Sequence, residues 1–455
     1  MDKIKNKLLT YQIQHTENLV RIIQNNAACL DASDTGTGKT YCAIAACYIL
    51  KKSPIIICPK SVINTWKTVC AYFDVKPYLI INYESLKTGN HYDKIKKIET
   101  KNVNLETKNN KVSYEFEEVP HTIFIFDEAH RCANMGTENS SMLFAAKKTN
   151  TPILLLSATI ADFPEKFKPF FYILNFIDPE QLKGVHLDLN KYMRIIDEWI
   201  FRDKRPMVRI HTMLYPKRAS RMRIDVLGDL FPQTQITATP YTLDKKRADE
   251  IQQEYKKLHL ELEEIKNKKD SDKGNPLTLI LRAQQRIEIL KIPIFIEMCN
   301  DLRQNNYSIV IFVNFTKTLE VICSMLHTTS KIYGEQTQAE RMKVIDDFQL
   351  NKTNVIVCNI KAGGIGISLH DINGTNPRAS LISPTWSSID LVQALGRIHR
   401  AGGKTKSLQR IIYVAETVEE KIADKLKSKL LNINYINNGD LDLTNIDFEN
   451  QRKKI

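Results

Sequence analysis

Short apolar runs recur along this chain, and polar or charged residues follow nearly every one of them. Strands that are apolar throughout are buried on both faces, which is typical of parallel sheets covered by helices. In such sheets, functional residues follow the carboxyl ends of the strands. The sequence therefore predicts an α/β protein. The runs are residues 54–58, 78–81, 122–126, 153–156, 308–313, 354–358, 380–382 and 409–414.

The runs fall into two groups, which predicts two parallel-sheet lobes in a chain of 455 residues. Between the groups, apolar residues recur at spacings of four and three over residues 243–269, which predicts an amphipathic helix. This stripe spans only about two heptads, so a packed helical subdomain is favoured over a coiled coil. We expect an N-terminal lobe (1–178), a helical insertion and linker (179–275), a C-terminal lobe (276–431) and a polar tail (432–455).

Four further segments complete the expected organisation. The apolar spacing predicts helices over residues 8–23 and 418–431. The polar residues 90–118 form an insertion with a hairpin expected near residues 112–116, and residues 266–276 are a polar break typical of a linker.

Charge and cysteine usage narrow the class of protein. A net charge of +13 suits a polyanionic partner, nucleic acid before membrane, although a lysine-rich surface alone gives the same excess. The nine cysteines include no C-x-x-C pair, so neither a zinc site nor a disulfide framework is indicated. Cys58, Cys323 and Cys358 stand in apolar context, which predicts buried thiols in a reducing compartment. Without a signal core or an apolar run of bilayer length, we expect a soluble intracellular protein with no membrane partner.

A glycine-rich loop, Ser-Asp-Thr-Gly-Thr-Gly-Lys-Thr, occupies residues 33–40 and leads into an apolar helix start. Gly36 and Gly38 allow backbone N–H groups to turn around phosphate oxygens, while Lys39 can reach the β and γ phosphates and Thr40 can hold Mg²⁺. The helix N-terminus adds partial positive charge. Ser33 stands where this loop usually has its first glycine. The loop predicts nucleotide binding, and the alternative is a simple turn before a helix.

Upstream of the loop, the amide of Gln12 could pair with both the donor and the acceptor edge of adenine, although a surface glutamine is the simpler interpretation. Asp127 and Glu128 end another apolar run, where the aspartate can hold Mg²⁺ through water and the glutamate can deprotonate an attacking water. Arg397 and Arg400 are three residues apart, so we expect them on one helix face, reaching a γ-phosphate across a cleft. A basic helix face is the alternative.

Taken together, these motifs resemble those of superfamily 2 helicases and translocases, specifically the Swi/Snf-like DNA-dependent ATPases, from Tyr11 to Lys429. The resemblance implies two RecA-like lobes joined by the helical insertion, with ATP between residues 33–40 and the two arginines. The motif-bearing segments are residues 11–12, 33–40, 59–61, 64–66, 82–84, 127–134, 157–159, 221–232, 311–316, 362–369 and 393–400.

The resemblance implies ATP and Mg²⁺ as cofactors. The implied catalytic residues are Lys39, Asp127, Glu128, Gln393, Arg397 and Arg400. The implied nucleotide-binding residues are Gln12, Ser33, Asp34, Thr35, Gly36, Thr37, Gly38, Lys39, Thr40 and Gly366, with Thr40 and Asp127 toward the metal. The implied nucleic-acid contacts are Lys60, Ser61, Asn82, Asn314, Thr316, Gly364 and Trp386. His130, Ser157 and Thr159 are implied to couple ATP hydrolysis to movement.

Some positions depart from the Swi/Snf-like pattern. Ala133 replaces a usual lysine and Ile160 a usual proline, while Gly396 and residues 157–159 are closer to unwinding helicases. Residues 401–404, with residues 369–371, resemble helicases of large cytoplasmic DNA viruses. These departures leave open whether the enzyme only translocates or also unwinds.

We therefore expect a nucleic-acid-stimulated ATPase that moves along or unwinds DNA, in preference to RNA, and holds it mostly through phosphates. It would act as a monomer, alone or in a transcription, replication or repair complex. The expected location is cytoplasmic or nuclear, or a virion or virus factory for a viral protein. The alternatives are a catalytically weak nucleic-acid clamp and the motor subunit of a restriction-type system.

Overall fold

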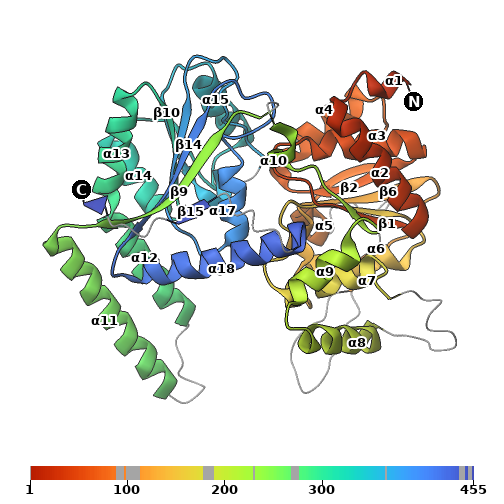
Figure 1. Cartoon of the computed structure of the whole chain (residues 1–455), viewed down its shortest axis with the longest axis horizontal. Helices are drawn as coiled ribbons and strands as arrows, with labels where there is room; N and C mark the ends of the chain where they lie inside the picture. The colour runs from red at the N-terminus through yellow and green to blue at the C-terminus, as the bar shows by residue number, and fades with distance from the viewer. Residues whose placement is uncertain are drawn as a thin grey trace. The chain divides into compact units, whose positions relative to one another are not determined.

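The structure is a computed structural model of the whole chain, and it describes residues 2–88, 97–98, 113–177, 189–228, 231–267, 276–363, 366–439, 446–448 and 453–454. The chain forms two compact units, the first made of Met1–Gly228 with Leu431–Leu443 and the second of Asp229–Leu430 with Thr444–Ile455. Each unit has its own parallel sheet with helices on both faces (Figure 1). The predicted α/β fold with two parallel-sheet lobes is confirmed. In the part of the chain that is described, no helix is both long and apolar enough to cross a membrane.

The sheet of the first unit contains six strands, all paired in parallel. Asp31 and Asp127 both lie in register with Leu156, so the glycine-rich phosphate loop (residues 33–40) and the acidic pair (Asp127 and Glu128) begin at the same edge of the sheet. In spatial order the strands are β3 (Leu79–Asn82), β2 (Ser53–Cys58), β6 (Thr122–Asp127), β7 (Ile153–Leu156), β1 (Ala28–Asp31) and β8 (Ala219–Ser220).

Helices bury both faces of this sheet. On one face α2, α3 and α4 form a core with strand residues such as Ile56, Ile125 and Leu154. On the other face α6 to α9 form a second core around Phe124 and Phe126. The helices and 3-10 turns are α1 (Asp2–Lys5), α2 (Thr10–Asn26), α3 (Lys39–Leu50), η1 (Lys60–Val62), α4 (Ile63–Tyr72), α5 (Tyr83–Thr88), η2 (Ala129–Cys132), α6 (Glu138–Lys148), η3 (Pro164–Phe167), α7 (Lys168–Ile173), α8 (Leu189–Arg202), α9 (Pro206–Leu214) and α10 (Ile224–Leu227).

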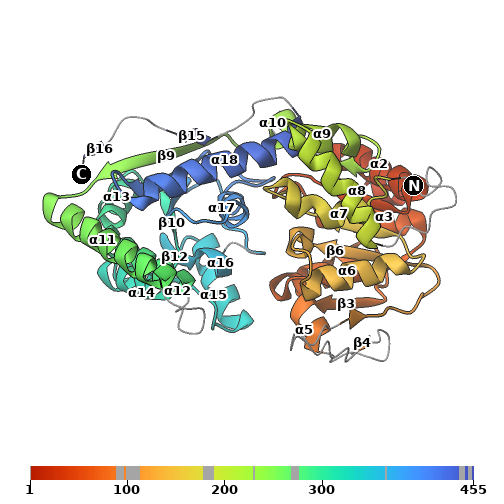
Figure 2. The same ribbon diagram turned by 90° about the horizontal axis from the view of Figure 1, so that it is seen from below.

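The sheet of the second unit is also parallel in all of its described pairs. Figure 2 shows β15 and β16, from the C-terminal end of the chain, alongside β9. The strands are β11 (Lys331–Ile332), β12 (Val355–Asn359), β10 (Ser308–Val313), β13 (Arg378–Ile382), β14 (Ser407–Val414), β9 (Thr234–Thr242), β15 (Ile446–Phe448) and β16 (Lys453–Lys454).

Two cores cover this second sheet. One contains α13, α14 and alternate residues of β10, and the other contains α17, α18 and the remaining residues of β10. Because successive strand residues point to opposite faces, a fully apolar β10 supplies both cores. The helices are α11 (Lys245–Asn267), α12 (Pro276–Leu290), α13 (Ile292–Gln304), α14 (Thr316–Met325), α15 (Gln338–Gln349), α16 (Ile360–Gly363), α17 (Ser388–Leu395) and α18 (Val418–Asn438).

The stretch expected to be a helical insertion, residues 179–275, contributes to both compact units. Its helices α8 and α9 belong to the first unit, and α11, the predicted amphipathic helix, belongs to the second. The same stretch contains β9, which the sequence analysis did not predict because threonines and a proline interrupt its apolar pattern. Strand β9 pairs with β14 along the whole length of β14.

Four other expectations can be compared with the structure. The terminal helix does not end at residue 431: α18 continues to Asn438, because Ile433 and Ile436 are buried beyond the expected end. Within the expected insertion at residues 90–118, β4 (Lys97–Ile98) pairs antiparallel with β5 (Ser113–Tyr114). Most of the expected linker, residues 268–275, lies outside the described residues. All nine cysteines are buried and unbridged, so the prediction of buried thiols is confirmed.

Candidate active site

The glycine-rich loop leads into α3, as the sequence predicts, and it follows strand β1, which was not among the predicted apolar runs. Gly36 and Gly38 have φ angles of 84° and 92°, in the left-handed region that favours glycine. A Cβ atom on Gly38 would lie 2.3 Å from the side-chain nitrogen of Gln12, so a larger residue cannot be accommodated without displacing Gln12. The backbone conformation therefore favours glycine at position 38, and a side chain there would also have to move Gln12 away from the loop.

Lys39, the first residue of α3, folds its side chain back across the loop. Its ammonium group donates to the carbonyl oxygens of Ser33, at 2.8 Å, and Asp34, at 3.1 Å. These are acceptors that phosphate oxygens can replace, because an ammonium group has three donors and the lysine stem is flexible. The loop therefore carries a positive charge at its centre, at the N-terminus of a helix, which is a favourable arrangement for an anion.

Gln12 on α2 is buried against the loop rather than lying on the surface. Its amide nitrogen donates to the carbonyl of Thr37 at 3.0 Å, and its amide oxygen accepts from the N–H of Leu9 at 3.0 Å. The structure thus brings Gln12 to the nucleotide loop. Recognition of adenine by this amide stays a prediction.

Ser33, which replaces the usual glycine, is completely buried and hydrogen-bonded. Its hydroxyl accepts from the N–H of Met222 at 2.8 Å and lies 3.3 Å from Nε2 of His15. The ring of His15 also lies 3.0 Å from Asp31 and, through Nδ1, 3.0 Å from the hydroxyl of Ser220. The departure at position 33 therefore has a structural role, because the hydroxyl ties the loop to the chain after β8.

Burial alone would raise the pKa of Asp31, but the adjacent His15 and the hydrogen bond from the backbone of Ser33 hold it below its ordinary value. Asp31 is therefore ionised beneath the phosphate loop. This role of His15 has no signal in the sequence, because a single histidine on a helix face belongs to no motif.

Asp127 is the last residue of β6, at the level of the phosphate loop. Its carboxylate accepts from the indole N–H of Trp66 at 2.9 Å and from the N–H of Glu128 at 3.0 Å, while its carbonyl accepts from Tyr83 at 2.8 Å. Burial, together with the nearby charge of Glu128, raises the pKa of Asp127 to about 6. Neither Trp66 nor Tyr83 was assigned a role in the active site from the sequence.

Glu128 follows in a left-handed backbone conformation, with φ 54° and ψ 51°. Non-glycine residues adopt this conformation at a cost, and such residues cluster at functional sites. The carboxylate lies 3.3 Å from Nδ1 of His130, and the same nitrogen lies 3.3 Å from the hydroxyl of Ser157. That hydroxyl also accepts from the N–H of Thr159 at 3.3 Å. The three residues predicted to couple hydrolysis to movement thus form a chain of contacts that reaches Glu128 through His130.

The donor groups at this edge fit Mg²⁺. Thr40 supplies a hydroxyl, and Asp127 and Glu128 supply carboxylates, which are the hard oxygen ligands that Mg²⁺ prefers. Burial disfavours the ionised form of Asp127. A divalent cation bound beside this carboxylate would favour the ionised form. When bound with ATP, the metal would neutralise charge on the phosphates.

In the second unit, Arg397 and Arg400 follow α17. The prediction that they share a helix face is wrong, because α17 ends at Leu395, Arg397 lies in the turn that follows and Arg400 lies in the irregular segment after that turn. Arg397 is buried and donates to the carbonyl of Ile367 at 3.1 Å. Arg400 donates to the hydroxyl of Ser368 at 2.8 Å. The tertiary contacts of these residues, rather than a helix, orient the two guanidinium groups.

The other predicted site residues of the second unit differ in how far they are buried. Gln393 is buried on α17. Gly366 has a φ of 74° and is exposed, whereas Gly364 lies outside the described residues. Trp386 is partly buried, with the ammonium of Lys425 5.3 Å from the centre of its ring, and it lines a cavity of about 600 Å³.

The two asparagines predicted to contact nucleic acid form side-chain hydrogen bonds within the protein. Asn314 donates from its amide to Glu288 and to the carbonyl of Pro384, both at 2.9 Å, and Glu288 also accepts the N–H of Asn314 at 2.8 Å. Asn82 pairs with Ser85, at the start of α5. Glu288 is 2% exposed and fixes the loop after β10, a role that the sequence did not indicate.

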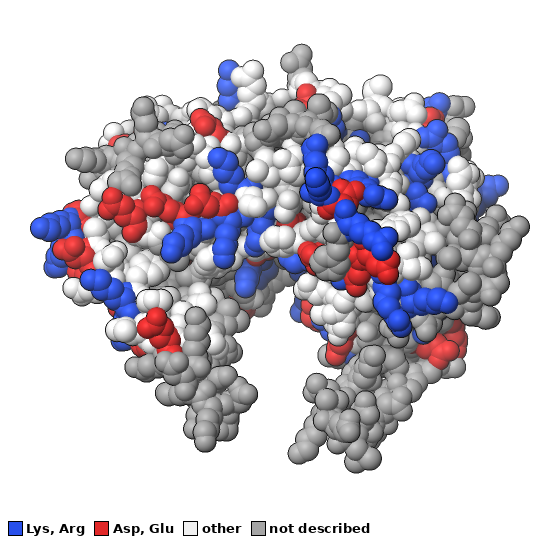
Figure 3. All heavy atoms as spheres, turned by 60° about the horizontal axis from the view of Figure 1, so that its bottom comes forward, with Lys and Arg blue, Asp and Glu red and all other residues white. Residues whose placement is uncertain are grey.

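Lys60 and Thr316 are exposed, and Ser61 is partly exposed. On the face drawn in Figure 3, Lys and Arg side chains alternate with Asp and Glu side chains. On that face the positive side chains therefore do not form one uninterrupted basic patch. The prediction of nucleic-acid binding depends on individual residues instead of on a continuous basic surface.

Two family models match the chain. The model "Type III restriction enzyme, res subunit" matches residues 5–162, which include the phosphate loop and the acidic pair. The model "Helicase conserved C-terminal domain" matches residues 290–402, which include both arginines.

Relatives match over most of the chain. A protein of Acanthamoeba polyphaga mimivirus, named as a candidate ATP-dependent RNA helicase, is 38% identical over 96% of this chain and 84% of its own length. An ISWI chromatin-remodelling complex ATPase of Saccharomyces cerevisiae is 22% identical over 94% of this chain, which spans 40% of that protein. The solved Sulfolobus solfataricus SWI2/SNF2 ATPase core in complex with dsDNA aligns over 95% of this chain and 93% of its own, with 19% identity and a TM-score of 0.37.

The fold and the site define an ATP-hydrolysing enzyme whose activity depends on nucleic acid. The chain belongs to the superfamily 2 helicases, is Swi/Snf-like, and resembles the viral members of that family.

Proposed function

We propose that this enzyme is a DNA-stimulated ATPase that translocates along duplex DNA, with unwinding weak or dependent on a partner. The observation that carries the proposal is the Swi/Snf-like segment at residues 221–232, whose first residues pack directly against the phosphate loop. The N–H of Asp34 donates to the carbonyl of Met222 at 3.0 Å, and the hydroxyl of Ser33 accepts from the N–H of Met222. The yeast remodelling ATPase among the relatives supports the same choice.

Unwinding demands more than stepping. Breaking stacked base pairs costs about 1.4 kcal/mol per step on average, and requires an element at the fork. Movement along a backbone needs only cyclic opening and closing driven by ATP. Translocation is therefore the less demanding function for a chain of this size.

RNA is the direct rival as the polymer. The mimivirus relative is named as an RNA helicase and is the more similar of the two relatives, at 38% identity. We favour DNA because residues 221–232, and Arg131 and Asn134 after the acidic pair, resemble the Swi/Snf-like pattern.

In the proposed cycle, Lys39 exchanges its contacts with the loop carbonyls for contacts with the β and γ phosphates. Asp127 and Thr40 hold Mg²⁺, and Glu128 takes a proton from the attacking water. Arg397 and Arg400 stabilise charge on the γ-phosphate in the transition state.

Coupling of hydrolysis to movement is proposed to run through His130. Its Nδ1 faces both Glu128 and Ser157, so a change in the glutamate during the cycle changes what the histidine can pair with. Ser157 in turn holds the N–H of Thr159. A shift at Glu128 would thus reach the loop after β7.

Nucleic acid is proposed to bind through its phosphates, which makes binding largely independent of sequence and sensitive to salt. Among the described residues, the proposed direct contacts to nucleic acid are Lys60, Ser61 and Thr316, since their side chains are at least partly exposed. Asn82 and Asn314 are proposed to shape the contacting loops, because their amides are already paired. Trp386 and Gly364 complete the proposed contact set. The protein is proposed to act as a monomer in a reducing compartment, where nine buried thiols remain unbridged.

The rival functions make different predictions. A clamp without catalysis has no need for the arrangement of Lys39, Asp127 and Glu128 at one sheet edge. The motor subunit of a restriction-type system would use the same ATP site. The family match to residues 5–162 includes the phosphate loop and the acidic pair of that site.

The test measures ATP turnover with no polymer, duplex DNA, single-stranded DNA and RNA, beside triplex displacement and unwinding of a forked duplex of equal length. We expect duplex DNA to give the largest stimulation, with ATP-dependent triplex displacement. Glu128→Gln should bind ATP but lose turnover by about 10²-fold or more, as for loss of a general base, whereas Lys39→Ala should weaken ATP binding.

Stimulation by RNA alone would assign the enzyme to the RNA helicases. Efficient fork unwinding without triplex displacement would reverse the preference for translocation. Polymer binding without any ATP turnover would support the clamp.

A further inference from the structure

The phosphate loop contains a carboxylate that opposes its own ligand. Asp34 lies two residues before Gly36, and its side chain is 22% exposed. ATP is a polyanion, so an unpaired negative charge in the loop would repel the phosphates and weaken binding. The structure provides a specific partner for this charge.

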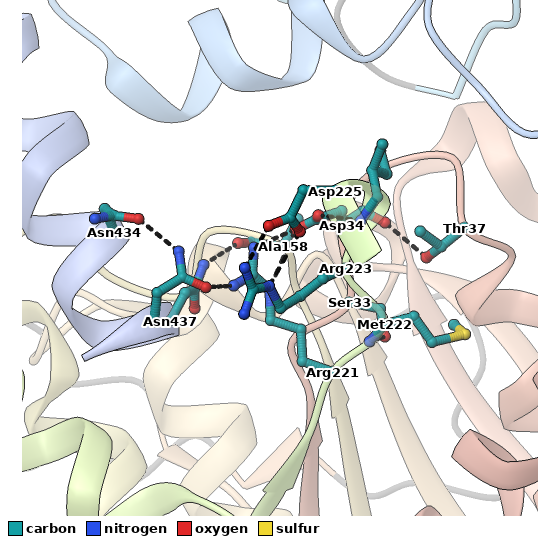
Figure 4. Close-up of polar contacts among 12 residues, drawn as sticks. Ser33, Asp34, Thr37, Ala158, Arg221, Met222, Arg223, Asp225, Asn434 and Asn437 are labelled. Atoms are coloured by element: carbon teal, nitrogen blue, oxygen red, sulfur yellow. Dashed lines mark hydrogen bonds and ion pairs between the residues drawn. The ribbon is translucent and has the colours of Figure 1, made fainter. Parts of the chain in front are cut away.

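Both carboxylate oxygens of Asp34 are occupied by one segment that follows β8. The guanidinium of Arg221 contacts Oδ1, with Nε at 3.2 Å and Nη2 at 2.5 Å. The N–H of Ile224 donates to Oδ2 at 2.9 Å, and the N–H of Asp34 donates back to the carbonyl of Met222 at 3.0 Å. Figure 4 shows Asp34 directed toward this segment.

The same guanidinium reaches a second element. Nη1 of Arg221 contacts the amide oxygen of Asn438, the last residue of α18. One turn of this helix also contacts the loop after β7, because Asn437 donates to the carbonyl of Ala158 at 3.1 Å (Figure 4). Arg221 therefore fixes its own position through α18 while it holds Asp34, and its side chain is only 12% exposed.

We propose that Arg221 is a positioning residue of the ATP site: it neutralises Asp34 and holds that carboxylate away from the phosphates. The inference rests on the proposed ATP-binding role of the loop. In this role Arg221 acts through Asp34 rather than on the phosphates themselves, so its removal affects nucleotide binding more than the chemical step. The effect grows with the number of phosphates, because the repulsion is between charges.

The experiment compares Arg221→Met with Arg221→Met/Asp34→Asn in the full chain. The readouts are KM and kcat for polymer-stimulated ATP hydrolysis, and the affinities for ATP and ADP. Arg221→Met should raise the KM for ATP about tenfold, which corresponds to about 1.4 kcal/mol, with kcat within about twofold of the parent. ADP binding should weaken less. The added Asp34→Asn should restore the KM, because the uncompensated charge is then gone.

Arg223→Met is the matched control. This arginine is two residues away and pairs with Asp225 instead of Asp34. We expect its KM to stay within about twofold of the parent. Equal losses in both arginine variants would overturn the proposal, as would a raised KM that Asp34→Asn does not restore.

Two further variants keep the test decisive. If Arg221→Met does not fold, Arg221→Lys retains the charge while losing the fork geometry, and its KM should stay within about threefold. A tenfold rise would overturn neutralisation as the mechanism. Lys39→Ala separates the two levels of inference: an unaffected Lys39→Ala enzyme would refute the ATP-binding role of the loop, whereas an inactive one beside a normal Arg221→Met refutes only the role of Arg221.

Discussion

Replacing Trp66 by phenylalanine tests whether the indole sets the charge on the candidate magnesium ligand. Trp66 is fully buried on α4, and its N–H donates to Oδ2 of Asp127 at 2.9 Å. Burial and Glu128 raise the pKa of Asp127 to about 6, and the indole hydrogen bond opposes that shift. A hydrogen bond to a charged group is worth about 1.5–3 kcal/mol, or roughly one to two pKa units at 1.36 kcal/mol each. Without it, the pKa should rise to about 7–8.

The sign of the effect follows from which form binds the metal. Mg²⁺ binds the ionised carboxylate, so protons compete with it, and a higher pKa weakens binding at any pH near that value. At pH 7 the ionised fraction of Asp127 should fall from about nine tenths to between about one half and one tenth. The Mg²⁺ concentration for half-maximal ATP hydrolysis should therefore rise roughly two- to tenfold at pH 7, and the difference should shrink as the pH rises toward 9.

The assay is ATP hydrolysis at saturating ATP and polymer, titrated with Mg²⁺ between pH 6 and 9. Phe73→Leu is the control, because Phe73 is buried in the same core and its ring has no hydrogen-bond donor. Both variants should lose thermal stability through imperfect packing, but only Trp66→Phe should shift the pH dependence of the Mg²⁺ requirement. An unchanged pH dependence in Trp66→Phe would refute this account of Asp127.

Three other substitutions test the second unit. Lys291→Met should lower the free energy of unfolding by about 3–5 kcal/mol in denaturant titrations, because it leaves the buried Glu419 carboxylate without its ion-pair partner, and adding Glu419→Gln should recover part of the loss. Arg400→Ala should lower kcat by about 10³-fold with little change in ATP affinity, and a pure affinity loss would contradict the transition-state role. Glu288→Gln should reduce stimulation by nucleic acid more than basal turnover, because it weakens the hold on Asn314; equal losses of both activities would contradict this role.

The sequence was sufficient for the strands of both sheets that read as unbroken apolar runs. Burial on both faces leaves a local and continuous signal, so β2, β6, β7, β10 and β12 could be located from runs of apolar residues alone. Strand β9 could not, because its burial is supplied by pairing with β14 and by neighbours far along the chain. The end of α18 was missed for a similar reason, since its asparagines are polar in sequence but are hydrogen-bonded in the fold.

The reactive groups of the candidate site could also be predicted from the sequence. Glycines, a lysine and paired acidic residues at fixed spacing form short motifs, and these motifs indicate phosphate and metal binding. The apolar run at residues 122–126 placed Asp127 and Glu128 at a strand end, and the glycine-rich loop placed Lys39 at a helix start. The helix expected for Arg397 and Arg400 was wrong, because the contacts of Arg397 with Ile367 and of Arg400 with Ser368 belong to a non-helical segment that no local periodicity encodes.

What only the tertiary structure decided is which residues hold and tune those groups. Trp66 reaches Asp127 because β2, which precedes α4, pairs with β6. Arg221 reaches Asp34, 187 positions away, because β8 pairs with β1. The chemistry is local in sequence because it depends on residue type and spacing, whereas the charge state and orientation of each group depend on neighbours that strand order alone brings together.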